Sequence, residues 1–422
     1  MKSSASVDDG VRATTSEVAN WLVIAAYCLL LVYWIVASAS AALALGFGQL
    51  NRTRKARGLH GMLVALARRI VAASARGKLH GDSPKQQRSM WTTWSVPHAW
   101  FAHFYVVGVV VALAMIAMLV ALMTWACKGK SMASTAVADI SRTMAPGMQV
   151  FPLLLFAAHA IRRLWESVYV FEASDARMSV LGYCAGMSYY VALPPSLCID
   201  RIGALVFDSP HVSCRPLTPI APMTMATFGV GFGAVLFVYG SWIQHSCHLH
   251  LASLRRLQSP RHGGSRREAY TRFGANISSS SRDTRYALPY KGWFRHVACP
   301  HYTAEIIVYI GLLTTIAATS PSISSASTSA SASLSLSVTL EKLIAAASVY
   351  FLILALAFGF IVCNLCVAGR STLAWYHAHY FPPPPHNVTA SSSSSSSTNS
   401  SSTSRRQDPP HRMHYAVIPF LI

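Results

Sequence analysis

Charged residues are scarce in this chain. Asp, Glu, Lys and Arg make up 12% of its 422 residues, whereas hydrophobic residues make up 53%. A soluble domain usually carries about 25% charged residues. The low charge therefore argues against a soluble fold and indicates a chain that sits in a lipid bilayer.

Several functional patterns are missing as well. No G-x-G-x-x-G follows a strand, so a Rossmann domain is excluded and any dinucleotide has to bind among helices and loops. Cys363 and Cys366 form a CxxC, but no second Cys pair or His pair stands at zinc spacing, so we expect no metal site. Inverted repeats and broken helices, which are typical of transporters, are absent too.

Long apolar runs are abundant. A helix needs about 20 apolar residues to cross the hydrocarbon core, and its backbone polar groups must be satisfied internally. The sequence therefore predicts an all-α, polytopic membrane bundle of about seven transmembrane helices. The first run is too long for a signal peptide and follows acidic residues, so we expect a retained helix. The runs lie near 19–47, 99–126, 148–168, 176–196, 222–244, 302–319 and 343–367.

The net charge of +20 is unevenly distributed between the two sides of such a bundle. One side holds 27 of the 35 Lys and Arg residues, in segments 51–97, 161–177, 246–301 and the tail after 368. Loops rich in Lys and Arg stay cytosolic and attract anionic lipid. We therefore expect a lumenal N-terminus, a cytosolic C-terminus and no nucleic-acid partner.

Some segments depart from the apolar pattern. A short amphipathic helix is expected around Met62–Val71, within a basic loop. The proline-rich segment 197–221 is expected to be irregular. The Ser-rich stretches at 318–337 and 386–407 cannot bury enough apolar surface to fold and are interpreted as insertions.

Ionisable side chains gather where the third run ends. Such residues at membrane depth are costly, and are therefore functional candidates. Offsets of three and four residues place them on one helix face, with an interfacial belt containing an Arg–Glu pair as the alternative. They are His159, Arg162, Arg163, Glu166 and Tyr169.

A second polar cluster follows the fifth run and precedes the sixth. His301 and Glu305 are spaced i, i+4 at the start of the sixth run. The free N–H groups and the dipole of a helix start favour anions. Together with nearby basic side chains, this start is a plausible seat for a phosphate-bearing cofactor.

Four stretches, in this order, resemble the steroid 5α-reductase family, most closely its polyprenol (polyprenal) reductase branch. The resemblance covers roughly residues 90–422, without the Ser-rich insertions. The stretches are Trp94-x-Val-Pro97-x-x-Trp-Phe101-x-His103-Phe-Tyr105, His159-x-x-Arg-Arg-Leu with Glu166 and Tyr169, Trp293-Phe-x-x-Val-x-x-Pro-His-Tyr-x-Ala-Glu305, and Pro410-His-Arg412 followed by Ala416-x-x-Pro419-Phe-Leu.

The resemblance implies an NADPH-dependent reduction of a carbon–carbon double bond next to an oxygenated carbon. Its substrate would be the α-isoprene unit of a long-chain polyprenoid lipid, giving dolichol for protein N-glycosylation at the endoplasmic reticulum. It divides the chain into a lumenal segment 1–18, a membrane region 19–246 and an NADPH-binding region 247–422. The implied cofactor contacts are Gln244, His248, Arg255, Tyr286, His301, Glu305, His377, Tyr380 and Arg412.

The reduction also needs a proton donor for the substrate oxygen. In the steroid-reducing branch a Glu of the second span and a Tyr of the third serve this purpose. The matching positions here fall near His103 or Phe104 and near Ala160, so both carriers are absent. The catalytic candidates are therefore His103, Tyr105, Tyr169 and Glu166.

Other interpretations remain, both within this family and outside it. The same family contains reductases of 3-oxo-steroids and of very-long-chain enoyl thioesters. A seven-helix receptor or a transporter would have similar apolar runs, but has no evident use for the segment from Trp293 to Glu305. The sequence also leaves open the oligomeric state and the choice between polyprenol and polyprenal.

Overall fold

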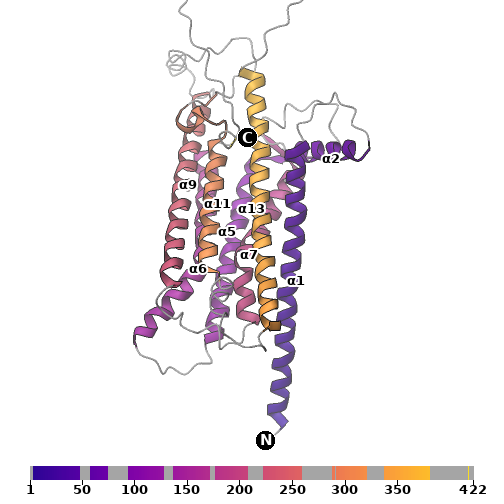
Figure 1. Cartoon of the computed structure of the whole chain (residues 1–422). Helices are drawn as coiled ribbons and strands as arrows, with labels where there is room; N and C mark the ends of the chain where they lie inside the picture. Colours follow the sequence, from indigo (N-terminus) through magenta and orange to yellow (C-terminus); the bar gives the residue numbers. More distant parts are fainter. Residues whose placement is uncertain are drawn as a thin grey trace, which may run out of the picture.

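The structure is a computed structural model, which describes residues 3–47, 58–74, 94–127, 136–171, 176–207, 222–258, 288–289, 291–320, 337–380 and 417. Long helices dominate these residues and pack side by side (Figure 1). They are α1 (Ser3–Phe47), α5 (Phe101–Cys127), α6 (Ala136–Trp165), α7 (Val180–Phe207), α9 (Pro222–Gln258), α11 (Pro300–Thr319) and α13 (Ser337–Tyr380). Each coincides with one of the seven apolar runs.

The long helices alternate in direction along the chain (Figure 1). Helix α9 ends, α11 begins and α13 ends at the same end of the bundle. Helix α2 (Gly58–Ser74) lies at this end, where it extends outward from α1. We call it the α2 end. The described helix termini that border the predicted basic segments all lie there.

Within the described residues, five helices are long and apolar enough to cross a membrane, which makes the chain a multi-pass membrane protein. Helices α6 and α7, the third and fourth predicted spans, belong to the same bundle but are not among these five. The five segments are Glu17–Gly46, His98–Trp125, Thr227–Arg256, Pro300–Thr319 and Ser348–Ala378.

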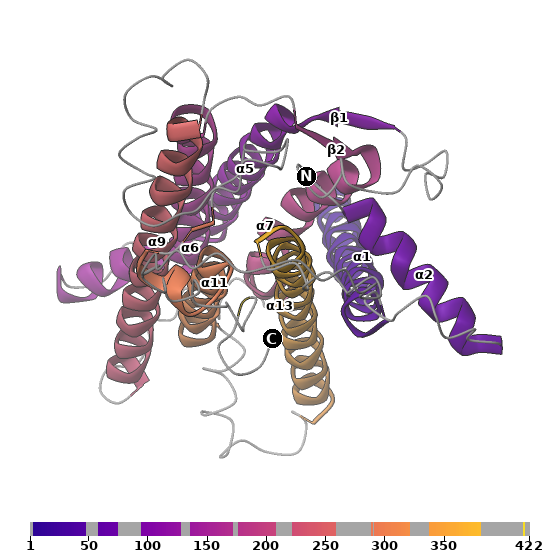
Figure 2. The same ribbon diagram turned by 90° about the horizontal axis from the view of Figure 1, so that it is seen from above.

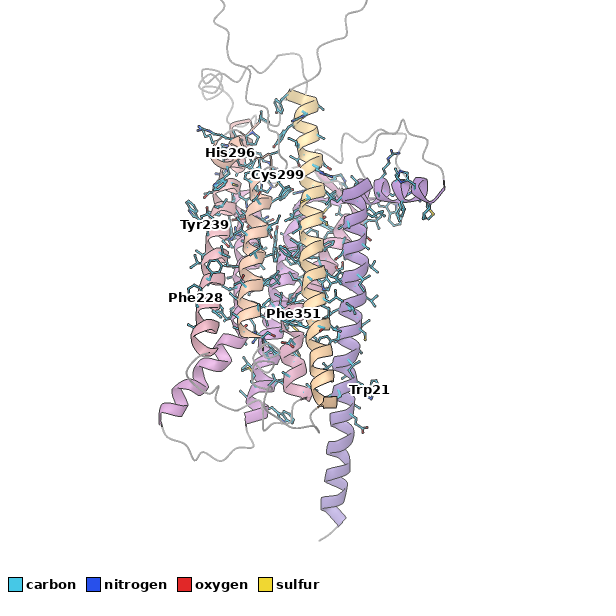
Figure 3. All side chains as sticks on the ribbon, in the orientation of Figure 1. Trp21, Phe228, Tyr239, His296, Cys299 and Phe351 are labelled. Atoms are coloured by element: carbon cyan, nitrogen blue, oxygen red, sulfur yellow. The ribbon has the colours of Figure 1, made fainter. Side chains whose placement is uncertain are left out.

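The outer surface of the bundle is apolar. Trp21 on α1 and Phe228 on α9 are largely exposed, and Tyr239 points outward farther along α9 (Figure 3). Inside the bundle, Trp34 is fully buried and donates a hydrogen bond to Ser196 Oγ at 2.8 Å. Apolar side chains thus cover the surface that faces lipid, while the buried indole N–H of Trp34 is paired inside the bundle.

Helices α9 and α11 touch through their backbones. A Cβ atom added to Gly311 would lie 2.6 Å from the carbonyl oxygen of Gly233 and from the amide of Phe237. A Cβ atom added to Gly240 would lie 2.9 Å from the carbonyl oxygen of Ala304. Small residues at a membrane helix interface allow this close approach. It fixes the residues of α9 relative to the start of α11.

Two short strands lead into α5 and α7 at the α2 end (Figure 2). Strand β1 (Ser95–Pro97) pairs antiparallel with β2 (Arg177–Ser179), with Val96 opposite Met178. The Arg177 guanidinium donates to Ser95 Oγ at 2.7 Å. The 3-10 turn η2 (His98–Trp100) then leads into α5, and η5 (Gly292–Arg295) precedes α11.

One expectation from the sequence is confirmed here and another is corrected. The predicted amphipathic helix is present as α2, but the segment 197–221 is wrong in part, since α7 continues to Phe207. Pro194 and Pro195 lie inside α7. The helix continues past them because its last turns are held by α11: Asp200 accepts a hydrogen bond from Ser320 at 2.7 Å, and Arg201 bonds to Thr319.

The predicted organisation of the chain is only partly visible. Residues 208–221, 321–336 and 381–416 lie outside the described part, and most of both Ser-rich insertions falls there. The boundary predicted at 246/247 falls within α9.

Candidate active site

A cavity of about 1060 Å³ lies inside the bundle towards the α2 end. Its walls come from α1, α2, α5, α7, α9, α11 and α13, and from the segment around Arg163 and Phe171. The volume is at the upper end of what ligand pockets usually have. One cavity therefore joins residues that are far apart in the sequence.

One region of this cavity is polar and basic. It brings together the ends of α6 and α9 with the start of α11, because the α9–α11 contact places these helix ends side by side. The polar residues that line it are Arg163, Gln244, His248, Arg255, His301 and Glu305.

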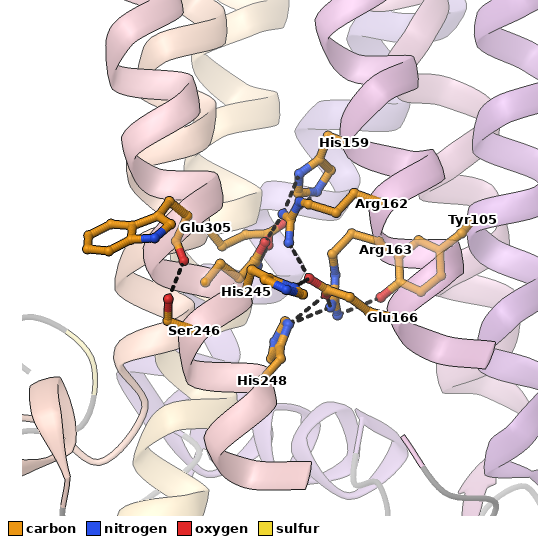
Figure 4. A network of polar contacts seen from close by, with 11 residues as sticks. Tyr105, His159, Arg162, Arg163, Glu166, His245, Ser246, His248 and Glu305 are labelled. Atoms are coloured by element: carbon orange, nitrogen blue, oxygen red, sulfur yellow. Dashed lines mark hydrogen bonds and ion pairs between the residues drawn. The ribbon is translucent and has the colours of Figure 1, made fainter. Parts of the chain in front are cut away.

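Glu166 is the centre of the polar network behind this region (Figure 4). Its side chain is fully buried and its two oxygens accept four donors. Arg162 Nη1 lies 2.6 Å from Oε1, and His248 Nδ1 lies 2.7 Å from Oε2. Arg163 and His245 supply the other two contacts. A buried carboxylate persists when it is paired in this way.

Arg162 connects this network to a second carboxylate, Glu305 (Figure 4). The Arg162 guanidinium contacts Gln244 Oε1 and His159 Nδ1, the latter at 3.3 Å. Gln244 donates to Glu305, and His159 Nε2 lies 3.2 Å from Glu305 Oε1. An N–H at Nε2 and a lone pair at Nδ1 satisfy both contacts of the His159 ring. Two carboxylates and two guanidiniums thus balance one another's charge.

Tyr105 ends this chain of contacts on the cavity wall. Arg163 Nη2 donates to the Tyr105 hydroxyl oxygen at 2.9 Å, and its guanidinium carbon lies 5.2 Å from the centre of the phenol ring. Tyr105 is buried in α5 and lines the cavity. Two further tyrosines of the cavity wall, Tyr189 and Tyr309, are joined by a hydrogen bond of 2.6 Å.

The rest of the cavity wall is mainly apolar. Val32 and Val36 of α1 line the cavity, and each is 60% exposed. The cavity therefore extends to α1, one of the candidate membrane spans. The apolar lining includes Val36, Ala41, Leu181, Ala185, Phe360 and Ile361.

Similar sequences connect this geometry to known proteins. No family model matches the chain. Polyprenal reductase 1 of Arabidopsis thaliana is 31% identical over 326 residues, covering 73% of this chain and 82% of that protein. This chain belongs to the polyprenal reductase branch of the steroid 5α-reductase family. Polyprenal reductase 2 of the same plant is 29% identical with the same coverage. The polyprenal reductase of Caenorhabditis elegans is 27% identical over 60% of this chain and 74% of that protein.

The four catalytic candidates of this polyprenal reductase family member differ in their position relative to the cavity. Tyr105 alone among them lines the cavity. Glu166 has no exposed surface and holds the two arginines and two histidines. His103 is exposed on α5 and contacts the Tyr183 hydroxyl at 3.1 Å. Tyr169 is 69% exposed and packs on Trp165.

The prediction that Tyr169 shares a helix face with His159, Arg162 and Glu166 is wrong. A local change of helix type explains the difference. Residues Glu166–Val170 form the π-helical turn η3 at the end of α6. A π-turn has wider spacing than an α-helix, so side chains beyond it rotate away from the i, i+4 face. Glu166 remains inside the network while Tyr169 points out.

The implied cofactor residues divide into three groups. Gln244, His248, Arg255, His301 and Glu305 line the polar region of the cavity. On the last turns of α13, Tyr380 packs with Trp375 and Tyr376, and neither Tyr380 nor His377 is part of the cavity lining. Tyr286 and Arg412 lie outside the described residues.

Sequence reasoning missed several residues of the site. His245 was not among the predicted site residues, although its Nδ1 lies 2.8 Å from Glu166 Oε1. The wall formed by α1, with Val32, Val36 and Ala41, was also missed. The i, i+3 spacing of His245 and His248 was the available indication for the first. Nothing in the sequence indicated the second. In the described part of the chain, no three His, Cys, Asp or Glu side chains are placed to hold a metal ion.

Proposed function

We propose that this chain reduces the α-isoprene double bond of a long-chain polyprenal with NADPH. The product would be the saturated dolichal, which serves dolichol synthesis and protein N-glycosylation at the endoplasmic reticulum. One observation carries the proposal: a member of the polyprenal reductase branch has a single cavity that joins a basic region to an apolar wall extending to α1, a candidate membrane span.

The polar region suits a dinucleotide phosphate. Arg255 lines it and is exposed, and an arginine fork matches phosphate oxygens. The Nδ1 atom of His301 is buried and has no hydrogen-bond partner among the described residues. Glu305 lies one turn farther along α11 and accepts hydrogen bonds, as a carboxamide donor would require. These residues would hold NADPH, which supplies a hydride when bound.

Tyr105 is the proposed proton donor. Hydride addition to the β-carbon of an enal places negative charge on the carbonyl oxygen, which needs a donor in the site. Because the Tyr105 oxygen already accepts from Arg163, its own proton is available for the cavity. The Arg163 guanidinium then stabilises the phenolate that proton transfer leaves. Glu166 is a positioning residue, since it holds Arg163 without reaching the cavity.

The same chemistry favours the aldehyde over the alcohol. An allylic alcohol has no carbonyl oxygen to accept the charge, so hydride addition to its double bond is not assisted. The aldehyde, by contrast, can be polarised by a single hydrogen-bond donor. We therefore propose polyprenal rather than polyprenol as the substrate.

The apolar wall suits a long isoprenoid chain. Moving such a lipid into water costs ~0.8 kcal/mol for each buried CH₂, so its tail remains in the bilayer. Val32 and Val36 of α1, a candidate membrane span, line the cavity and are exposed. The polyprenoid head would enter here while its tail stays in lipid. If the basic side is cytosolic, as the Lys and Arg distribution indicates, NADPH reaches the cavity from the cytosol.

A substrate panel tests the proposal. The purified full chain in lipid vesicles is supplied with NADPH and with polyprenal, polyprenol, a 3-oxo-steroid enone or a very-long-chain enoyl thioester. Mass spectrometry follows the gain of two hydrogens. We expect conversion of polyprenal and little of the other three. Conversion of the steroid or the thioester instead would replace the proposed substrate, and conversion of none would contradict the reductase assignment.

A further inference from the structure

Helix α2 is a short helix that packs on one side of the bundle. It begins at Gly58, whose φ of 67° only glycine adopts readily, and it lies beside α1 at the edge of the bundle (Figures 1 and 2). Val64 and Ala67 are buried, and the helix contacts α1, α7 and β2. One face of α2 is therefore packed on the protein.

The opposite side of α2 exposes large apolar side chains. Leu59 is 69% exposed, Met62 62% and Leu66 48%. Their spacing of three and four residues gathers them into one stripe. An exposed apolar stripe of this kind is unfavourable in water and favours an apolar partner.

The charge on α2 identifies the chemistry of that partner. Arg68 and Arg69 are the only charged residues in the sequence of this 17-residue helix. They follow the apolar stripe directly, and Arg69 is exposed. A helix that combines an apolar stripe with basic residues lies in the membrane interface, with its apolar side among acyl chains and its cations at lipid phosphates.

The position of α2 fits a location in the membrane interface. The candidate span Glu17–Gly46 of α1 ends shortly before α2 begins. Its residues Val32 and Val36 line the cavity, and both are exposed. Ile70, beside Arg69, lines the same cavity. Helix α2 thus lies beside a candidate membrane span.

We propose that α2 is an interfacial anchor that binds anionic phospholipid headgroups through Arg68 and Arg69. The lipid contact fixes α2 against α1 and thereby holds the cavity wall to which Ile70 contributes. The proposal does not depend on the reaction that the cavity performs. It concerns a bilayer surface and not a protein partner, because the exposed stripe is narrow and α2 packs on α1, a candidate membrane span.

Photoactivatable phospholipids test the anchor. The full chain is inserted into vesicles that contain a diazirine-labelled phosphatidylserine or a diazirine-labelled phosphatidylcholine, each at the same fraction. After illumination, mass spectrometry maps the labelled peptides. We expect labels on the α2 peptide containing Leu59, Met62 and Leu66, with phosphatidylserine preferred over phosphatidylcholine. Each basic residue adds about fivefold to binding of an anionic surface, so the preference should be about tenfold or more.

Paired variants make the result specific. The double variant Arg68→Gln and Arg69→Gln should label equally with both lipids, while Arg142→Gln in α6, towards the opposite end of the bundle, should retain the preference. Absence of lipid labels on α2 in the unchanged chain would overturn the proposal. Equal labelling by both lipids in that chain would overturn the anionic headgroup. Crosslinks between two copies through α2 would replace the lipid with a protein partner.

Discussion

The Arg163 guanidinium donates a hydrogen bond of 2.9 Å to the hydroxyl oxygen of Tyr105, and the two residues come from different helices, α6 and α5. Glu166 accepts a hydrogen bond from the same guanidinium (Figure 4). A phenol at the cavity wall is thereby fixed beside a permanent cation.

Replacing Tyr105 with Phe removes the proposed proton donor and keeps the ring. Loss of a general acid typically costs 10²–10⁴-fold in rate, so we expect turnover of polyprenal to fall by about that factor. NADPH binding, measured by isothermal titration, should stay near that of the unchanged chain. Tyr239→Phe, on the outward face of α9, is the matched control and should keep full turnover. Normal turnover in Tyr105→Phe would remove Tyr105 from the mechanism.

Replacing Glu166 with Gln removes the charge that two arginines and two histidines share. Breaking a buried ion pair by removing one partner costs about 3–5 kcal/mol, because the other charges stay buried. We therefore expect a clearly lower Tm of the detergent-solubilised chain, together with lower turnover. Glu17→Gln changes an exposed carboxylate of α1 and should leave the Tm unchanged. Equal Tm values for both variants would show that the network does not stabilise the bundle.

The start of α11 is the proposed seat of the nicotinamide and the phosphates. We expect His301→Ala and Glu305→Gln each to raise the KM for NADPH by about tenfold or more, since each removes a proposed hydrogen bond to the cofactor in a buried polar region. Initial rates at varied NADPH measure the effect. His296→Ala alters an exposed histidine just before α11 and should keep the KM. An unchanged KM in both site variants would remove the cofactor assignment.

The backbone contact between α9 and α11 positions the site from a distance. Gly311→Ala places a methyl group 2.6 Å from backbone atoms of α9, so the helices must separate. Overpacking of this kind costs about 1–3 kcal/mol, and it also moves Gln244 and His248 relative to Glu305. We expect a lower Tm and lower turnover. Gly231→Ala on α9 meets no atom within 4 Å and should be neutral. Similar behaviour of both variants would contradict the proposed role of the contact.

The sequence predicted the helices well because hydrophobic runs alone specify membrane helices. The all-α bundle is confirmed, and all seven apolar runs are helical, with five of them meeting the length and composition of a span. The end of α7 was missed, because two prolines usually interrupt a helix, whereas here contacts with Thr319 and Ser320 hold its last turns.

The site was predicted less completely. Helical spacing was sufficient to group His159, Arg162 and Glu166, since they lie on one element. The partner of each depends on packing between helices, such as His159 with Glu305, and spacing along one helix cannot indicate it. The π-turn that directs Tyr169 outward has no recognisable pattern in this sequence. Resemblance to a known family supplied Gln244, His248, Arg255, His301 and Glu305, all of which line the cavity.

A label-transfer experiment tests the central claim most directly. The full chain in vesicles receives polyprenal and NADPH that carries deuterium at the reactive position of the nicotinamide ring, and the product is examined by mass spectrometry and NMR. We predict one deuterium at the β-carbon of the α-isoprene unit, with a solvent-derived hydrogen at the α-carbon. A saturated product without deuterium, deuterium at the aldehyde carbon, or no product would contradict the account.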